Sequence, residues 1–366
     1  MGKASDRGRH HRPGKIKFSV IIFAAAAIML ASAAVLACIA GSAIYGASFK
    51  RTNSSEPLLR TIGEFPGLMA EQCSFASSRG QKLAGYKYYR QGLKPAGVVI
   101  IAHGLGVGGQ CVYMEVADYF VSHGYLVFAY DATAMDKSEG DTAVGMQQGV
   151  LDLASAIDYV EHDAEMKKYP LFLFGHSWGA YCVGAVLNVH PEVRAVAAVS
   201  GFDSTIGLYR CGFDETPQKR LLGKFLLPYF RLLEKFKFGK YADYTSMSGF
   251  AHSKAGVMVI HSRDDRNVPI GQGLDLYYAK YGHDPRFRFK RYEYRGHMYI
   301  FYKDAACAYD RKFVAEPSMQ PTDYAKTHKF DKKIGYDLDQ QLFGEILHFY
   351  DSCNPNSALR GQKTGN

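Results

Sequence analysis

The chain has 366 residues, and 47% of them are hydrophobic, so it is long enough for one large globular domain or two small ones. An aromatic content of 14% excludes a disordered chain. The formal net charge is +9, but residues 1–17 hold six basic residues and one acidic residue, which leaves +4 for the remainder. Nucleic-acid binding would need a clustered basic face in the folded part, and the charge instead lies beside an apolar segment, so no nucleic-acid partner is predicted.

That apolar segment covers residues 18–45 and directly follows the basic tail. About 20 apolar residues suffice to cross a bilayer as a helix, so the segment is predicted to be a transmembrane signal anchor. Because basic flanks stay on the cytoplasmic side, residues 1–17 are predicted to be cytoplasmic and the folded domain extracytoplasmic. The alternative is a secretory signal peptide cut at Ala31-Ser32-Ala33, which would release the domain.

The cysteines do not point to a metal. Cys38 lies in the apolar segment, and the other six permit disulfides whose pairing the sequence does not determine. Cys111 and Cys182 lie in apolar surroundings, where we expect small buried side chains. No Cys-x-x-Cys pair or His/Cys cluster has metal-ligand spacing, so neither a metal nor another cofactor is predicted.

Residues 46–75 are predicted to be a linker with an irregular lead-in to a folded domain at 76–353. Within that domain, short runs rich in Val, Ile, Leu and Phe alternate with helical patterns. Such runs are typical of parallel strands buried on both faces, so the predicted fold class is α/β with a mostly parallel sheet. The predicted strands are 98–102, 125–130, 171–174, 195–200 and 257–261, and the predicted helices are 114–122, 146–161, 180–189 and 273–280.

Other segments depart from this alternation. Residues 82–90 alternate in polarity, which favours an antiparallel edge strand, and residues 354–366 are predicted to be a flexible tail. Residues 202–250 separate two strands and are predicted to form a helical cap. Thr216-Pro217 is a good helix start within it, because Thr can cap the helix and Pro suits the first helical position.

The cap sequence from 217 to 240 carries seven basic residues and one acidic residue, a local charge of +6, among many leucines and phenylalanines. Pro228 is expected to kink or split this helix. Two arrangements fit the pattern. An ordinary cap helix would pack on the domain and leave its lysines in solvent, whereas a basic amphipathic helix would lie in an anionic bilayer interface.

The stretch "LFLFGHSWGA" ends an apolar run and places Ser177 between Gly175 and Gly179. A G-x-S-x-G elbow turns sharply from strand to helix and presents the serine hydroxyl above the sheet edge, which requires small neighbours. The flanking strand and helix patterns favour this elbow over a chance pair of glycines. Ser177 is therefore the candidate nucleophile.

A nucleophilic serine needs an imidazole base and a carboxylate that orients it, in the chain order Ser, acid, His. The turn after the strand at 257–261 contains two competing acids, Asp264 and Asp265. His297 follows a further strand pattern, "RFRFKRYEY", and can reach the serine from there. His283 precedes that strand and would lie at the wrong end of the sheet.

On these residues the chain resembles the α/β-hydrolases, in the branch of monoglyceride-lipase-like and serine-aminopeptidase-like enzymes, over about residues 80–350. The resemblance rests on His103-Gly104, Asp131 with Ser138 and Gly140, the Ser177 elbow, the Asp265 turn and Gly296-His297. In such families the acid follows a strand-end histidine by four residues, and counting from His261 gives Asp265. Ser262 stands where a glycine is usual, and "ATAMDK" replaces the usual glycine-rich stretch after Asp131.

The resemblance also implies an oxyanion hole built from two backbone amides. One follows the nucleophile and is that of Trp178, and the other follows the His-Gly pair and is that of Leu105. His103, Gly104 and Gly106 would form the supporting loop. A phosphate-cradling loop would explain the glycines too, but no G-K-[ST] follows them.

The predicted function is a membrane-anchored serine hydrolase that cleaves a carboxylic ester, with a small-molecule or lipid-like ester as its substrate. A peptidase and an acyltransferase on the same fold are alternatives, because the triad does not choose its acceptor. A non-catalytic binding protein is the remaining alternative, and the intact Ser, Asp and His set argues against it. The sequence does not determine the oligomeric state.

Overall fold

The computed structural model describes residues 18–54, 59–106, 108–214, 216–313 and 331–359. The predicted basic tail at 1–17 and the end of the predicted C-terminal tail lie outside the described residues. The chain forms two compact units, residues 1–44 and residues 45–366.

In the first unit, the described residues belong to helix α1 (Phe18–Ala47), which contains the segment predicted to be a transmembrane anchor. Its many alanines and the absence of an internal proline favour a helix. Among the residues that the structure describes, no helix has the length and apolarity needed to cross a membrane. The predicted transmembrane anchor is therefore not confirmed.

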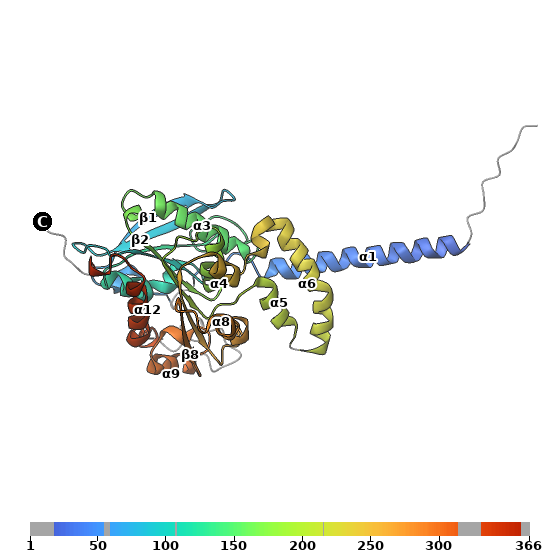
Figure 1. Cartoon of the computed structure of the whole chain (residues 1–366). Helices are drawn as coiled ribbons and strands as arrows, with labels where there is room; N and C mark the ends of the chain where they lie inside the picture. Colours follow the sequence, from blue (N-terminus) through green and yellow to red (C-terminus); the bar gives the residue numbers. More distant parts are fainter. Residues whose placement is uncertain (1–17, 55–58, 107, 215, 314–330, 360–366) are drawn as a thin grey trace, which may run out of the picture. The chain divides into compact units, whose positions relative to one another are not determined.

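The second unit is built on an eight-stranded sheet in the order β1-β2-β4-β3-β5-β6-β7-β8 (Figure 1). Strand β2 runs antiparallel to both of its neighbours, and the strands from β3 to β8 are parallel to one another. The strands are β1 (Met69–Ala76), β2 (Lys82–Tyr89), β3 (Val98–Ala102), β4 (Leu126–Tyr130), β5 (Leu171–His176), β6 (Ala195–Val199), β7 (Gly256–Ser262) and β8 (Phe287–Tyr292).

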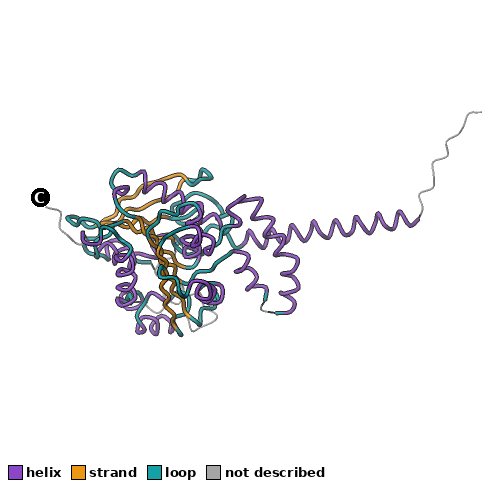
Figure 2. Tube along the Cα trace, in the orientation of Figure 1, coloured by secondary structure: helices purple, strands orange, loops and turns teal. Residues whose placement is uncertain are grey.

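Helices cover both faces of this sheet (Figure 2). Because side chains alternate along a strand, Val98 and Ile100 pack in one hydrophobic core while Val99 and Ile101 pack in the other. The first core also contains residues of α3 (Gln147–His162), α4 (Trp178–Ala185) and α8 (Leu274–Tyr281), and the second contains residues of α2 (Met114–Ser122), α9 (Asp304–Phe313) and α12 (Gln340–Ser352). A further short helix is α11 (Lys332–Gly335).

The predicted cap lies between β6 and β7 and is helical, with α5 (Thr205–Phe213), α6 (Pro217–Phe238) and α7 (Ser246–His252). Thr216 caps α6, since its hydroxyl accepts a hydrogen bond from the backbone N–H of Lys219 at 3.2 Å. The helix continues through Pro228, so the expected split does not occur.

Two sequence predictions need correction at the start of the sheet. The supposed lead-in contains strand β1, whose register pairs Met69 with Tyr89. Strand β2 was predicted to be an edge strand, but β1 covers it, and β1 is the edge. Only Phe75 of β1 is buried, so the strand lacks the apolar run that revealed the other strands.

Residues 45–54, which we call the strap, form part of the second unit, although Tyr45 was predicted to end the apolar segment and residues 46–54 to belong to the linker. Tyr45 and Phe49 are 2% and 1% exposed and lie in the first core. The guanidinium of Arg51 donates hydrogen bonds to the carbonyl oxygens of Ser138 and Gly140, both at 2.9 Å. The strap is therefore held to the loop that follows β4.

The predicted C-terminal tail also starts in the folded part. Asn354 is buried, and its side-chain amide donates to the carbonyl of Ala96 at 3.2 Å and to the hydroxyl of Tyr125 at 3.1 Å. The described residues therefore place the end of the packed domain beyond 353.

Candidate active site

The candidate site lies where the order of the parallel strands reverses. Strand β3 has β4 on one side and β5 on the other, and Ala102 at its end pairs with Gly175 of β5. In open α/β sheets, the loops that leave the carboxyl ends of such strands separate and form a crevice. The two loops here begin with His103-Gly104 and with Ser177.

Ser177 occupies the sharp turn between β5 and α4. Its φ of 56° and ψ of −116° are strained for a residue with a side chain, as a nucleophile elbow requires. A Cβ atom on Gly175 would lie 2.3 Å from the carbonyl oxygen of Gly179, and a Cβ on Gly179 would lie 1.9 Å from that of Ala102. Only glycine fits at both positions, which explains why two glycines bracket the serine.

The predicted base and acid lie next to this serine. The Nε2 atom of His297 is 2.9 Å from the Oγ atom of Ser177, and its Nδ1 atom is 2.7 Å from the Oδ2 atom of Asp265. A carboxylate in this position fixes the tautomer with Nδ1 protonated, which leaves Nε2 free to accept a proton from the serine. The side chain of Asp265 is buried and that of His297 is nearly so.

Asp264, the competing acid, has a different position. One of its carboxylate oxygens accepts hydrogen bonds from the Ser262 hydroxyl at 2.6 Å and from the backbone N–H of Gly296 at 2.8 Å. Asp264 therefore joins the turn after β7 to the loop that carries His297, whereas the imidazole of His297 pairs with Asp265. The serine at 262, a departure from the related families, supplies one of these two donors.

A second histidine supports Asp265. The Nε2 atom of His261 is 3.2 Å from Oδ2 of Asp265 and 2.9 Å from the carbonyl oxygen of Val268. Burial by itself would raise the pKa of Asp265, but the hydrogen bonds from His261 and His297 outweigh it and hold that pKa well below its ordinary value. Asp265 is therefore a carboxylate throughout the physiological pH range.

A chain of hydrogen bonds links the glycine loop to His297. The backbone N–H of Gly104 donates to the Tyr113 hydroxyl at 2.9 Å, and that hydroxyl lies 2.9 Å from Nδ1 of His176. The Nε2 atom of His176 donates to the carbonyl oxygen of His297 at 3.0 Å. Burial and the neighbouring His297 lower the pKa of His176 to about 3, so its ring is neutral, with Nδ1 accepting from Tyr113.

The two residues predicted to form the oxyanion hole, Leu105 and Trp178, lie in the loop after β3 and at the start of α4. Trp178 begins α4, so its amide lacks an acceptor within the helix, and its indole N–H donates to the carbonyl of Met146 at 2.7 Å. Leu105 is half-buried in the loop after β3, where Gly106 has a φ of +88°. His103 is buried with both ring nitrogens bonded, to the carbonyl of Gly104 and to the amide of Ala132.

The strap reaches this glycine loop as well, which the sequence did not reveal. Asp136 accepts hydrogen bonds from the backbone N–H of Ser54 and from that of Gly109, the latter at 2.8 Å. A Cβ atom on Gly108 would lie 1.9 Å from Oγ of Ser54. Asp131, at the end of β4, accepts from the amide of Gln110 at 2.9 Å, so two carboxylates fix the far side of the loop.

Among the described residues, a cluster that could hold a metal ion lies outside the candidate site. Asp158, Glu161 and His190 could place three ligand atoms within 4.8 Å of one another, but the two acids are exposed. None of the three is a residue of the site around Ser177.

The sheet order and the elbow at Ser177 are those of the α/β-hydrolase fold. Comparison with known proteins agrees: residues 93–230 match the family model described as serine aminopeptidase, S33. Matches to curated proteins are shorter. The chain is 30% identical over 142 residues to the uncharacterized protein YfhR of Escherichia coli O157:H7 and 28% identical over 152 residues to YfhR of Salmonella typhi.

The matched region covers 37% and 38% of this chain, and the chain spans about half the length of these relatives, at 48% and 50%. Solved structures show the same fold over more of the chain. The esterase Pf2001 of Pyrococcus furiosus superposes with a TM-score of 0.52 at 17% identity, over 75% of this chain and 99% of the esterase. An acetyl xylan esterase from Paenibacillus sp. R4 has a TM-score of 0.50 at 15% identity, over 65% and 82% of the two chains.

Proposed function

We propose that the protein is a serine hydrolase that cleaves a carboxylic ester through Ser177, His297 and Asp265. The observation that carries this proposal is the continuous series of hydrogen bonds from Ser177 Oγ through the imidazole of His297 to Asp265. A non-catalytic role would not require the strained φ of Ser177. The structural similarity to two esterases adds support from the fold alone.

In the proposed mechanism, Oγ of Ser177 attacks the ester carbonyl carbon while Nε2 of His297 takes the hydroxyl proton. The imidazolium, stabilised by Asp265, then protonates the leaving alkoxide, and an acyl-enzyme forms. Water attacks this intermediate with His297 again as the base, which releases the acid and restores the serine. The lowered pKa of Asp265 keeps the negative charge beside the imidazolium at each stage.

The proposed oxyanion hole consists of the backbone amides of Leu105 and Trp178. Donors of this kind stabilise the negative charge that develops on the carbonyl oxygen in the transition state. The Trp178 amide has the added advantage of the helix N-terminus of α4 behind it. The bonds from Tyr113 and Asp136 to the glycine loop would hold the other amide in place.

A fluorophosphonate probe tests the proposal, because it reacts with an activated serine. We expect it to label the wild-type chain and not the Ser177→Ala variant, which should retain the wild-type melting temperature. A panel of esters of increasing chain length and of aminoacyl amides then separates an esterase from a peptidase. An unlabelled but folded wild-type protein would contradict the assignment of a catalytic serine.

An aminopeptidase needs a carboxylate that receives the substrate's amino group. Glu234 is a buried acid of the cap, but its oxygens already accept hydrogen bonds from the Thr205 hydroxyl at 2.8 Å and the Tyr209 hydroxyl at 3.1 Å. The amide of Gln147 and the hydroxyl of Tyr45 also donate to it, at 3.3 and 3.4 Å. With four neutral donors around it, Glu234 is already satisfied, so it is not the carboxylate that an aminopeptidase would offer to a substrate's amino group.

We also propose, from the charge pattern of the sequence, that the hydrolase domain is exported from the cytoplasm. Six basic residues precede the apolar segment, whereas only Lys50 and Arg51 follow it closely. Protease added to intact cells or spheroplasts should then reach the domain. A domain that becomes digestible only after lysis would contradict this location.

A further inference from the structure

The cap helix α6 exposes a stripe of large apolar side chains. Phe225 is 72% exposed, Leu232 66% and Phe236 88%, and Leu221 and Leu222 are 59% and 46% exposed. Residues 221, 225, 232 and 236 follow helical spacing, so their side chains lie on one side of α6. We call Leu221, Leu222, Phe225, Leu232 and Phe236 the outer stripe.

The outer stripe is not the face by which the helix packs. Gly223, Leu226, Phe230, Glu234 and Phe238 are the buried residues of α6. At about 100° per residue they lie on the opposite side of the helix from the outer stripe. Isolated exposed leucines are ordinary on a protein surface, but an apolar row along several helical turns marks a contact surface.

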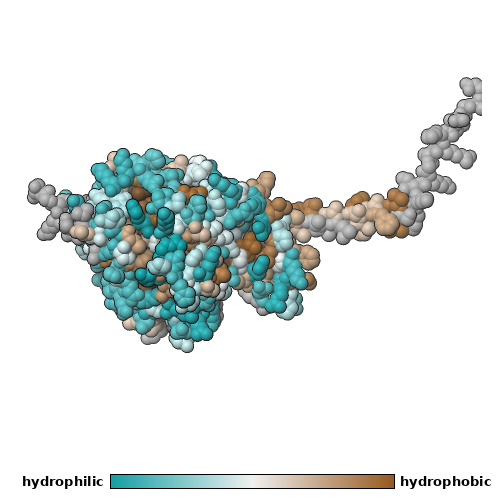
Figure 3. All heavy atoms as spheres, viewed as in Figure 1, coloured by the Kyte–Doolittle hydropathy of each residue, from teal (hydrophilic) through white to brown (hydrophobic). Residues whose placement is uncertain are grey.

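Cations border the outer stripe along one side. The same helical geometry places Arg220, Lys224, Arg231 and Lys235 in a row next to it. Arg220 is 3.5 Å from Asp214, and Lys235 pairs with Asp243, but neither Lys224 nor Arg231 has an acidic partner among the described residues. Figure 3 shows hydrophobic and hydrophilic surface side by side over this part of the cap. Glu234 is the acid of the helix, and it is buried away from this surface.

We propose that the outer stripe seats on an anionic lipid surface, with its leucines and phenylalanines in the acyl boundary and Lys224 and Arg231 among the headgroups. A straight apolar row with a border of one charge sign complements a flat, continuous anionic surface. A specific protein partner would need a contact of about 800 Å² on this chain with polar groups matched one by one. The inference is independent of the proposed ester chemistry.

A local fluorescence measurement tests the proposal on the full chain. The chain has one tryptophan, Trp178, which is 2% exposed and supplies a constant background. Phe225→Trp places a second tryptophan in the outer stripe. With vesicles of phosphatidylcholine and phosphatidylglycerol carrying brominated acyl chains, we expect blue-shifted, strongly quenched emission from position 225. Vesicles of phosphatidylcholine alone should quench it far less, and added salt should weaken the quenching on anionic vesicles.

The matched control for position is Tyr278→Trp, an aromatic residue of α8 that is 55% exposed. The Tyr278→Trp protein keeps the same N-terminal segment, so it can still bind vesicles through that segment. Since Tyr278 is not on α6, we expect little quenching at this position. Unquenched emission from position 225 on anionic vesicles would overturn the proposal, as would equal quenching at both positions.

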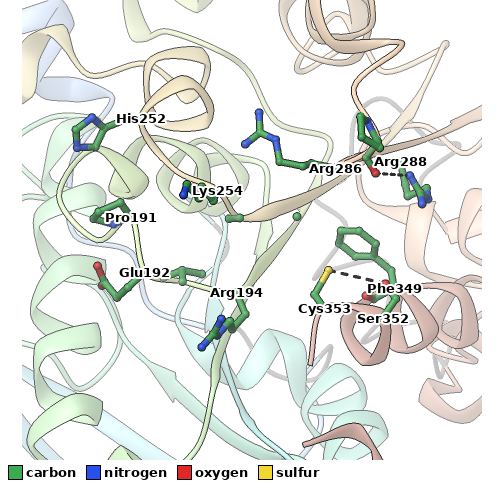
Figure 4. Close-up of a pocket in the computed structure, with 14 residues that line it drawn as sticks. Pro191, Glu192, Arg194, His252, Lys254, Arg286, Arg288, Phe349, Ser352 and Cys353 are labelled. Atoms are coloured by element: carbon green, nitrogen blue, oxygen red, sulfur yellow. Dashed lines mark hydrogen bonds between the residues drawn. The ribbon is translucent and has the colours of Figure 1, made fainter. Parts of the chain in front are cut away.

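The matched control for charge uses a second basic surface. Replacing Lys224 and Arg231 with glutamate in the Phe225→Trp protein should weaken vesicle binding about ten-fold or more. The same change at Arg194 and Lys254 alters net charge equally and should leave the quenching intact. Those two exposed residues line a pocket where β6 and β7 begin, at the sheet end opposite Ser177 (Figure 4).

If both double variants lost vesicle binding equally, net charge alone would explain the binding, and the proposal would be overturned. An emission shift at position 225 that grows with protein concentration without vesicles would assign the stripe to a second copy of the chain. Neither result touches the proposed hydrolysis, which fluorophosphonate labelling and a water-soluble short-chain ester measure separately.

Discussion

Tyr113 couples the two halves of the candidate site through a single hydroxyl group, which accepts from the Gly104 amide and donates to His176. Removing it with Tyr113→Phe leaves the buried Gly104 amide and His176 Nδ1 without partners, at a cost of about 1–3 kcal/mol for each group. With an ester that the wild-type protein hydrolyses, we expect kcat to fall about ten-fold or more, with a smaller change in KM.

The control for this change is Tyr125→Phe, at the start of β4 and thus the other end of the sheet. That tyrosine bonds Asp351 at 2.9 Å and Asn354 at 3.1 Å, so its loss costs stability in the same way. Its kcat should stay near wild type. If both variants lowered kcat equally, the Tyr113 effect would be one of general stability.

Asp264 and Asp265 are adjacent in sequence, but their different hydrogen-bond partners predict different effects of mutation on activity. Asp265→Asn disturbs the tautomer of His297, and we expect kcat to fall by about 10⁴-fold. Asp264→Asn keeps a carbonyl oxygen for Ser262 and Gly296, so activity should stay within about ten-fold of wild type. Steady-state kinetics of the two variants tests this expectation. A larger loss of kcat in Asp264→Asn than in Asp265→Asn would make Asp264 the acid of the triad.

At the scale of the element, the elbow between β5 and α4 tolerates no side chain beside the serine. Gly179→Ala would place a Cβ atom 1.9 Å from the carbonyl of Ala102, so β3 and α4 would have to separate. We expect this variant to melt well below wild type or fail to fold. Gly212→Ala in α5 meets no atom within 4 Å and should be neutral or stabilise by up to about 1 kcal/mol. Comparable melting temperatures for both would contradict the described packing.

Whether a strand could be predicted from the sequence depended on how many of its residues are buried. Strands such as Val98–Ala102 are buried at every residue, so they read as plain apolar runs. Strand β1 is an edge strand with one buried residue, Phe75, and carries no such signal. The strap was missed for a different reason: Tyr45 was taken as the end of the apolar segment and Phe49 as part of the linker, although both lie in the first core.

The candidate site could be predicted where each residue follows a strand. Ser177 comes directly after β5, and the acid pair and His297 follow β7 and β8 within five residues, so chain order and strand context were sufficient to name them as candidates. Asp136 was not predictable, because its partner Ser54 lies 82 residues away in the chain and neither has a local pattern. The residues alone did not distinguish Asp264 from Asp265 as the acid, and the family resemblance favoured Asp265. In the structure, the 2.7 Å distance between Oδ2 of Asp265 and Nδ1 of His297 distinguishes the two.

For the whole molecule, Glu115 sets an expected dependence of stability on pH. Burial outweighs its ion pair with Arg60 and raises the pKa of Glu115 to about 7. The folded protein therefore holds this proton more tightly than the unfolded chain, whose glutamate has an ordinary pKa of 4.5. The stability that the proton contributes is fully present below pH 4.5 and is lost as the pH rises through about 7.

The glutamine in the Glu115→Gln variant does not ionise, so the substitution should remove this contribution to the pH dependence of the free energy of unfolding. Denaturant unfolding of the wild type and the variant at a series of pH values measures the difference. We expect the variant to gain relative stability as the pH rises from 4.5 to 7. A difference that stays constant across this range would show that Glu115 keeps its ordinary pKa.

The buried strap also limits how the chain can be processed. The division between the two units falls before Tyr45, inside helix α1, so the apolar segment and the first core residue of the hydrolase share one helix. A peptidase acting at Ala31-Ser32-Ala33 would leave Tyr45, Phe49 and Arg51 in place and release the second unit intact. A cleavage after Phe49 would instead detach two core aromatic residues. The cleavage that releases the second unit and the one that damages its core would then lie fewer than twenty residues apart in the chain.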